Sequence, residues 1–412
     1  MNYDEILDFL YKRKGSYGTG YKLDRVIALF DRLNIRNVPF KTIHITGTNG
    51  KGSTSAMLES IYRHTGYKTG LFTSPHLISV FERIQVNRQQ ISCEQFCQIF
   101  HKIYPVAEEL ENKNPEFRIS FFEYITAIAL LFFREQVVDV AVIEAGLGGR
   151  LDATNAIQNT TISIITTIAY DHENTLGSTL AQIAQEKAGI LRPYSLCILG
   201  NNIRGDAYDA IVQTARHNHC EIFQVQSIGT LFSNDVATYQ NYNAATAILA
   251  AKVLRQNAIL PIKDEQISFG LKQFQWPGRW QKFSLGNRLL IFDGAHNEEG
   301  ALALAQELKK LNKKVTLIYG SNTVERATKM LNILAPFCEK IELTASHHEH
   351  ALSVNLLKNC IPKEHFFKSG DIELENINYF IHNAPASVLV VSGSLYLVGD
   401  VMRQSIIYHE ND

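Results

Sequence analysis

The sequence has few of the features that mark secreted, metal-stabilised or nucleic-acid-binding proteins. Its six cysteines among 412 residues form no Cys-x-x-Cys pair, so we expect reduced thiols and no structural zinc site. Lysine plus arginine number 40 and aspartate plus glutamate 41, which gives a formal net charge of -1. That balance provides no overall field for recruiting nucleic acid.

Long apolar segments are also missing. The most apolar stretch, Ile125–Phe133, is too short to span a bilayer, which takes about 20 residues in a helix. The N-terminal residues MNYDEILDFLYKRKG carry acidic side chains and lack the apolar region of a signal peptide. We therefore expect a cytoplasmic protein with no membrane partner.

Short apolar segments alternate with longer amphipathic ones along the chain. The apolar segments are rich in β-branched residues, which is typical of parallel sheets covered by helices on both faces, so the predicted class is α/β. The predicted strands are 42–46, 138–144, 161–168, 196–199, 289–292, 315–319 and 387–391. The predicted helices are 24–33, 53–64, 94–110, 121–135, 180–188, 243–256, 298–311 and 324–337.

A domain boundary is expected near the segment Trp276–Trp280. Its proline and glycine interrupt the helical pattern, and a new series of strands and helices starts at Leu289. The length also favours more than one domain. We therefore expect one domain over residues 1–281 and a second over residues 282–412.

The strongest local motif is TIHITGTNGKGST, residues 42–54, in which an apolar strand leads through glycines into a helix. Such a loop exposes backbone N–H groups to phosphate oxygens, and the helix N-terminus adds partial positive charge. Lys51 would contact the β- and γ-phosphates, and the Ser53 hydroxyl a magnesium ion or a phosphate oxygen. The spacing is shorter than the usual phosphate loop, and the alternative is an ordinary strand–turn–helix junction.

A second group of polar residues follows the predicted strand at 138–144. Glu144 lies at the carboxyl end of that strand, where α/β sheets bind ligands, so it is a candidate magnesium ligand. Arg150, Asp152 and Asn155 crowd the following glycine-rich loop. The alternative for Glu144 is a solvated strand end.

Asp171 and His172 follow the next predicted strand, again just beyond its carboxyl end. A histidine near a phosphate loop is a candidate metal ligand, although magnesium prefers oxygen. Lys187 falls near the end of a predicted amphipathic helix, and its chemistry alone predicts a surface lysine.

Several motifs then occur in a fixed order. They are TGTNGKGS, TSPHL (73–77), FERI (81–84), FFEY (121–124), VIEAGLGGRLDATN, DH, EKAGI, NAATA (243–247), PGRW, DGAHN (293–297) and SGSLYL (392–397). Together they resemble the folylpolyglutamate synthase/dihydrofolate synthase family of the Mur ligase superfamily, from near the N-terminus to about residue 400. The resemblance implies a P-loop ATPase domain, with a mostly parallel sheet and a smaller accessory sheet, and a smaller C-terminal Rossmann-like α/β domain.

The resemblance also implies roles for individual residues, with Lys51, His172 and Lys187 as the catalytic ones. The expected ATP contacts are Gly47, Thr48, Asn49, Gly50, Lys51, Gly52, Ser53, Asn243, Arg279, Asp293 and His296. The expected magnesium ligands, at two sites, are Ser74, Glu144 and His172, with Lys187 N-carboxylated. The expected substrate contacts are Phe121, Phe122, Arg150 and Asp152, together with a substrate loop at Gly18–Arg25.

The activity implied is ATP-dependent formation of an amide between a folate or pteroate carboxylate and L-glutamate. The acid would be activated as an acyl phosphate, which the glutamate amine then attacks. No Gly-x-Ser-x-Gly nucleophile motif is present, in agreement with that mechanism. The expected partners are these small molecules alone, and we expect a monomer.

Two segments of the second domain depart from the family pattern. GSNTVERATKM (320–330) replaces an Asp-Lys-Asp segment, and TASHHEHAL (344–352) replaces a Pro-Arg-Ala segment. His347, His348 and His350 in the latter favour an exposed polar loop over a metal site. Two alternatives therefore remain: a Mur-superfamily ligase for another acid, and a non-catalytic nucleotide-binding paralogue.

Overall fold

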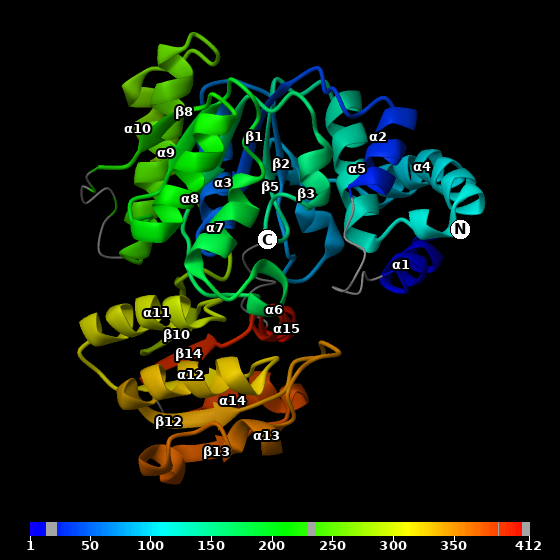
Figure 1. The fold of residues 1–412 in the computed structure, drawn as a ribbon. Helices are drawn as coiled ribbons and strands as arrows, with labels where there is room; N and C mark the ends of the chain where they lie inside the picture. The colour runs from blue at the N-terminus through cyan, green and yellow to red at the C-terminus, as the bar shows by residue number, and fades with distance from the viewer. Residues whose placement is uncertain (14–22, 227, 229–231, 233–235, 386, 406–412) are drawn as a thin grey trace. The chain divides into compact units, whose positions relative to one another are not determined.

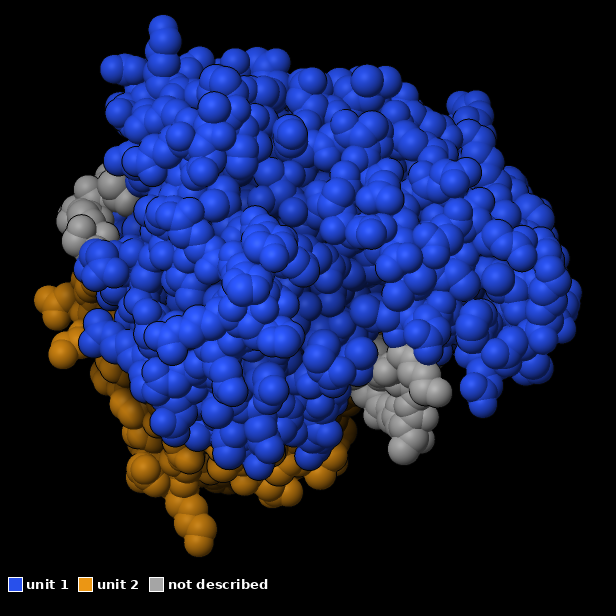
Figure 2. All heavy atoms as spheres, turned by 45° about the horizontal axis from the view of Figure 1, so that its top comes forward, with its two compact units in different colours: residues 1–75, 80–232, 240–274 blue, residues 76–79, 233–239, 275–412 orange. Residues whose placement is uncertain are grey.

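The computed structural model describes residues 1–13, 23–226, 228, 232, 236–385 and 387–405 (Figure 1). Most of the expected substrate loop at Gly18–Arg25 lies outside these residues. The chain divides into two compact units (Figure 2). The first holds residues 1–75, 80–232 and 240–274, and the second holds 76–79, 233–239 and 275–412. Trp276–Trp280, where we expected a boundary, thus belongs to the start of the longest segment of the second unit.

The first unit contains an eight-stranded sheet in the order β4-β3-β2-β5-β1-β6-β7-β8. Its strands from β2 to β8 pair in parallel, and β3 and β4 add an antiparallel edge. The strands are β1 Lys41–Thr46, β2 Thr69–Phe72, β3 Ile84–Val86, β4 Gln89–Gln90, β5 Val140–Glu144, β6 Ile162–Ile165, β7 Leu196–Leu199 and β8 Glu221–Gln224. The predicted parallel α/β class is confirmed.

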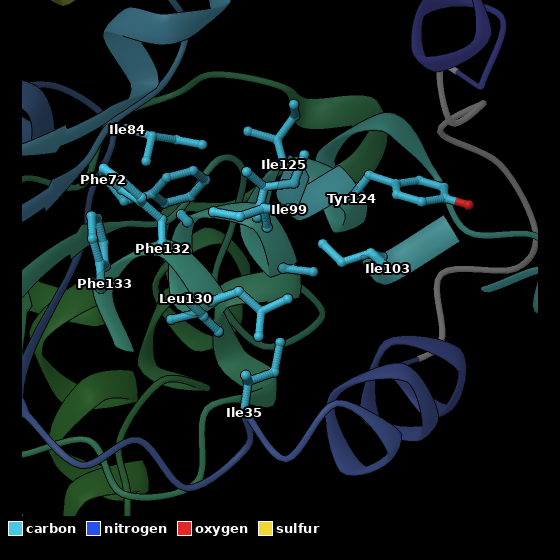
Figure 3. Close-up of a cluster of buried hydrophobic side chains, with 14 of the residues drawn as sticks. Ile35, Phe72, Ile84, Ile99, Ile103, Tyr124, Ile125, Leu130, Phe132 and Phe133 are labelled. Carbon is cyan, nitrogen blue, oxygen red and sulfur yellow. The ribbon is translucent and has the colours of Figure 1, made fainter. Parts of the chain in front are cut away.

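Helices surround this sheet (Figure 1). They are α1 Tyr3–Tyr11, α2 Asp24–Arg32, α3 Lys51–Arg63, α4 Cys93–Lys113, α5 Phe121–Glu135, α6 Glu173–Leu176, α7 Leu180–Ala188, α8 Gly205–His217, α9 Tyr239–Gln256 and α10 Asp264–Lys272. Helix α5 begins with a capping box, in which the Ser120 and Glu123 side chains satisfy each other's backbone N–H groups. Its apolar residues then pack into the core cluster of Figure 3, where Phe132, Phe133 and Phe72 lie together.

The second unit contains a six-stranded sheet in the order β13-β12-β11-β14-β10-β9, parallel except for the hairpin of β9 and β10. The strands are β9 Gln281–Leu285, β10 Arg288–Phe292, β11 Val315–Tyr319, β12 Cys338–Leu343, β13 Ser369–Asp371 and β14 Val388–Ser392. The helices are α11 Glu298–Lys310, α12 Val324–Leu334, α13 Val354–Lys358, α14 Ile377–Asn383 and α15 Leu395–Gln404.

The resemblance implied a smaller accessory sheet in the first domain. Among the described residues the strands form one sheet in each unit, and several residues between β8 and α9 lie outside this description. The antiparallel strands β3 and β4 extend the edge of the main sheet. No helix in the described part of the chain is long and apolar enough to span a membrane.

Candidate active site

The phosphate-loop motif forms a tight turn between β1 and α3, as its glycines predicted. Gly50 precedes the helix at a φ of 83°, a left-handed conformation that favours glycine. A Cβ added to Gly50 would lie 2.2 Å from Asn243 Oδ1, and one added to Gly47 would lie 1.9 Å from Thr166 Oγ1. The turn therefore needs glycine at both positions, and it brings Asn243 of α9 against the loop.

The segment after β6 holds this loop in place. Thr48 N donates to Thr167 O at 2.9 Å, and Asn49 N donates to Thr167 Oγ1 at 2.9 Å. The Thr166 hydroxyl donates to Asn49 O at 2.7 Å. These bonds hold the phosphate loop against the same segment that leads to Asp171 and His172.

Two lysines converge on one carbonyl of the loop. Lys51 Nζ donates to Gly47 O at 2.9 Å and to Thr48 O at 3.1 Å. Lys187 Nζ reaches the same Gly47 O at 2.9 Å from α7. The arrangement places two lysine amines beside a turn whose backbone N–H groups and helix N-terminus favour an anion.

Lys187 is not the surface residue that its helix pattern alone predicted, because its side chain is 3% exposed. Burial, together with the charge of Lys51, lowers the pKa of Lys187 to about 7. The carboxylates of Asp171 and Asp152 oppose that shift. A large part of the Lys187 side chains is therefore neutral near pH 7.

Glu144 is the last residue of β5 and is only 3% exposed, so it is not a solvated strand end. Its Oε2 accepts a hydrogen bond from Ser74 N at 3.1 Å, which joins two of the three expected magnesium ligands. Strands β5, β1 and β6 are parallel neighbours, so their carboxyl ends meet at one edge of the sheet. A buried carboxylate at that edge is a suitable ligand for magnesium.

His172 lies in the segment beyond β6, in a left-handed conformation with a φ of 52°. Its side chain is 43% exposed, and its Nε2 lies 3.9 Å from Asp171 Oδ2. In the described part of the chain, no three His, Cys, Asp or Glu side chains gather closely enough to hold a metal ion. Magnesium bound here would take most of its ligands from water and phosphate oxygens, as it commonly does.

The glycine-rich loop after Glu144 carries two of the four expected substrate contacts, Arg150 and Asp152. Asp152, 6% exposed, accepts hydrogen bonds from Leu147 N at 2.9 Å and Thr154 N at 3.0 Å. Burial raises the pKa of Asp152, while these hydrogen bonds lower it. Arg150 is more exposed and pairs with Glu186 at 2.8 Å.

The two phenylalanines at the start of α5 differ in their contacts. The Phe122 ring lies against the glycine-rich loop, since a Cβ added to Gly146 would be 2.7 Å from it. Phe121 instead stacks on Tyr11 at 5.4 Å, and the Arg83 guanidinium lies 5.4 Å from its ring centre. Both rings are partly buried against the core cluster, so they pack as well as border the loop.

The remaining expected ATP contacts lie in the second unit, around the end of β10. Asp293 Oδ2 accepts from Tyr239 OH at 2.7 Å and from Trp280 N at 3.1 Å, and Oδ1 accepts from Ala295 N at 2.9 Å. A Cβ added to Gly294 would lie 2.0 Å from Arg279 Nη1, so the guanidinium packs on that glycine.

His296 Nδ1 in the same turn lies 2.9 Å from Gly294 O, so Asp293 and His296 belong to one folded turn. Tyr239 carries no motif of its own, and its hydrogen bond to Asp293, 54 residues further along the chain, forms only in the folded protein.

The histidine-rich segment forms an exposed loop, as predicted. His347 is 58% exposed, and its backbone N donates to Asp400 Oδ2 at 2.8 Å. The His348 ring stacks on Tyr396, with centroids 3.9 Å apart. These contacts tie the loop to α15.

Comparisons with known proteins agree with this geometry. The Mur ligase middle domain matches residues 45–245. The chain is 31% identical to dihydrofolate synthase/folylpolyglutamate synthase of Bacillus subtilis, over 94% of this chain and 96% of that protein. Among solved structures, folylpolyglutamate synthase of Thermotoga maritima has a TM-score of 0.82 at 31% identity, covering 97% of this chain and 96% of that one.

Escherichia coli FolC, solved with DHPP and ADP, has a TM-score of 0.86 at 26% identity and covers 100% of this chain and 99% of that one. The similarity in sequence and in fold extends over nearly the whole length of this chain. The chain therefore belongs to the folylpolyglutamate synthase/dihydrofolate synthase family of ATP-dependent ligases.

Proposed function

We propose that this chain uses ATP and magnesium to join L-glutamate to a dihydropteroate or folate carboxylate, with the residue roles expected from its motifs. The observation that carries the proposal is the convergence of Lys51 and Lys187 on Gly47 O in the phosphate loop. Relatives support the ligands: E. coli FolC was solved with DHPP and ADP, and a bifunctional folylpolyglutamate synthase/dihydrofolate synthase with Mn, AMPPNP and L-glutamate.

In the proposed reaction, an oxygen of the acceptor carboxylate attacks the γ-phosphorus of ATP, and the bond to the β-phosphate oxygen breaks to release ADP. The glutamate amine then attacks the acyl phosphate carbon, loses a proton, and phosphate leaves. Lys51 and the N–H groups at the start of α3 would neutralise charge on the phosphoryl group. Magnesium would supply a Lewis acid for phosphate oxygens, held by Ser74, Glu144 and His172.

Lys187 would act as a carbamate in this scheme. A neutral amine attacks carbon dioxide and loses a proton, which gives a carbamate anion and so converts a cation into an oxygen donor. Its burial and its pKa of about 7 favour the neutral amine that this reaction requires. Enzyme equilibrated with ¹³C-bicarbonate should show a carbamate carbon resonance that is missing from Lys187→Met. No such resonance in the wild type would reject the modification.

In the second unit, we propose that Arg279, Asp293 and His296 contact the nucleotide, with Asn243 contributing from α9. Under this proposal residues 1–281 act as the ATPase domain and residues 282–412 as the ligase domain, in a monomer. The hydrogen bonds that fix Asp293 from three backbone and side-chain donors support a rigid binding turn.

The experiment measures phosphate release from ATP and magnesium with dihydropteroate or tetrahydrofolate as acceptor, with and without glutamate. Turnover that needs both the acceptor and glutamate supports the proposal. Turnover with other acids only would favour a different Mur-superfamily ligase, and ATP binding without turnover a non-catalytic paralogue. Replacing glutamate by other amino acids tests whether the departures at 320–330 and 344–352 alter the choice of amine.

Lys51→Ala is the matched variant for this assay. Loss of the phosphate-loop ammonium should lower kcat by about a hundredfold or more, as removal of one transition-state donor commonly does. Lys252→Ala, on an exposed position of α9, is the control and should leave turnover unchanged. Near-normal activity of Lys51→Ala would reject the role of the loop.

A further inference from the structure

A buried histidine lies in the central strand of the first sheet, and the proposed reaction does not use it. His44 in β1 has no exposed surface, and its Nε2 lies 2.7 Å from Thr154 Oγ1. The Thr154 hydroxyl in turn lies 2.6 Å from Asp152 Oδ1, and Leu147 N donates to Asp152 Oδ2. A chain of hydrogen bonds therefore runs from the middle of the sheet to the glycine-rich loop after Glu144.

The direction of these hydrogen bonds follows from counting protons. The Thr154 hydroxyl has one proton, and its short contact with a carboxylate directs that proton to Asp152. Thr154 Oγ1 must then accept from His44, which requires the proton of the imidazole to be on Nε2. The His44 Nδ1 is left as a buried acceptor that has no hydrogen-bond partner among the residues that the structure describes.

His44 is a costly residue for this position. Burial, with a smaller contribution from Arg192, lowers the pKa of His44 to about 3, so the ring is neutral at physiological pH. A buried nitrogen without a partner destabilises the fold, and valine or isoleucine would fill a central strand without that cost. A histidine that destabilises the strand at this position indicates that its Nε2 donor is needed to maintain the chain of hydrogen bonds.

We propose that His44 and Thr154 are positioning residues for the acceptor substrate. Through their hydrogen bonds they hold the Asp152 carboxylate, and with it the loop 145–152, in the geometry that receives a pterin-containing acid. The inference rests on the proposed function, in which Asp152, Arg150 and Phe122 contact that acid. Linked hydrogen bonds of this kind strengthen one another in a buried environment, so a defect at His44 reaches Asp152.

Two pairs of variants test the proposal. His44→Gln keeps an N–H donor near the Nε2 position, and His44→Met has a similar size but no donor. Thr154→Ser keeps the hydroxyl, and Thr154→Val replaces it by a methyl group. His44→Met and Thr154→Val should raise both KM and Kd for dihydropteroate by about tenfold and leave KM for ATP within about twofold. His44→Gln and Thr154→Ser should bind the acceptor nearly as the wild type does.

The double variant His44→Met/Thr154→Val should be no worse than either single variant, because one chain of bonds is already broken. Equal losses for His44→Gln and His44→Met, or equal rises in KM for acceptor and ATP, would show a merely structural role and overturn the proposal.

A measurement on the wild-type enzyme is independent of both folding of the variants and activity. Nitrogen NMR of ¹⁵N-histidine-labelled enzyme, assigned with His44→Gln, should show a neutral His44 ring protonated at Nε2 at pH 7. A proton on Nδ1, or an imidazolium, would overturn the inference. Failure of the wild type to ligate folate acceptors would instead reject the proposed function and leave the tautomer result to decide the hydrogen bonds.

Discussion

At the scale of single residues, Lys187 should make the free energy of unfolding increase as pH rises above about 7. Its folded-state pKa of about 7 lies below the ordinary value of 10.5. Below pH 7 the ammonium is charged in both states, so folding carries the full cost of burying it. Between pH 7 and 10.5 the folded state is neutral while the unfolded state is still protonated, so the cost decreases as pH rises.

Lys187→Met should therefore be more stable than the wild type by about 1–3 kcal/mol at pH 6, with a smaller difference at pH 9. Gly47 O keeps the hydrogen bond from Lys51, so this carbonyl retains a partner in the variant. Urea unfolding in carbon-dioxide-free buffer at the two pH values measures this difference. A constant difference would show that the ammonium is not the titrating group.

Gly50 and Gly66 separate two effects of adding a methyl group. Both have positive φ values, 83° and 98°, so alanine costs about 1 kcal/mol of backbone strain at each. At Gly50 the new Cβ would lie 2.2 Å from Asn243 Oδ1, whereas at Gly66 no atom of the described residues lies within 4 Å of it. Gly50→Ala should weaken ATP binding by more than about tenfold in calorimetry, and Gly66→Ala should leave it unchanged. Similar losses of ATP affinity in the two variants would show that backbone strain alone causes the effect.

At the scale of helices and strands, the sequence predicts well those elements whose ends are marked by residues close in the chain, such as helix caps. Helices α5 and α7 have the predicted bounds, since the capping boxes of Ser120 with Glu123 and Thr179 with Gln182 define their starts. Strand β12 was missed because charged residues interrupt it, and the fold buries Glu342 through its ion pair with Lys340.

The same distinction holds for the candidate site. The glycine turn could be predicted from the sequence because the backbone conformation of the turn depends on its own residues. The burial of Lys187 was not, since it depends on Gly47, far away in the chain. The Tyr239 contact with Asp293 likewise exists only through folding.

Helix α10 packs so closely on α3 that a substitution favourable for the helix itself should destabilise the protein. A Cβ on Gly270 would lie 2.5 Å from Ile61 Cα and 3.0 Å from Ser60 O, so the two helices would have to separate. Gly270→Ala should thus destabilise the protein by about 1–3 kcal/mol, although alanine normally stabilises a helix. Ser268→Ala, on the exposed side of α10, is the control and should be neutral or slightly stabilising. A stabilised Gly270→Ala would contradict this packing. Urea unfolding followed by circular dichroism measures both.

At the scale of the whole molecule, the chain passes several times from one unit to the other. Within the second unit, Asp293 forms hydrogen bonds with residues of two of that unit's segments, 233–239 and 275–412. Tyr239 ends one crossing segment and Trp280 lies just after another, and both donate to Asp293 Oδ2. Asparagine offers one carbonyl oxygen and an NH₂ group, so it cannot accept all three hydrogen bonds made to this carboxylate. Asp293→Asn should lose about 1–3 kcal/mol, and Tyr239→Phe, which removes one bond, about 1 kcal/mol.

The position of the tryptophans allows each unit to be followed separately. The chain has 2 tryptophans, Trp276 and Trp280, and both lie in the second unit. Tryptophan fluorescence therefore reports that unit, whereas circular dichroism reports helices of both. Because each unit has its own core, Asp293→Asn should lower the urea midpoint seen by fluorescence, and Gly270→Ala should lower only the midpoint seen by circular dichroism. If each variant instead shifted both midpoints equally, the two cores would unfold as one cooperative body.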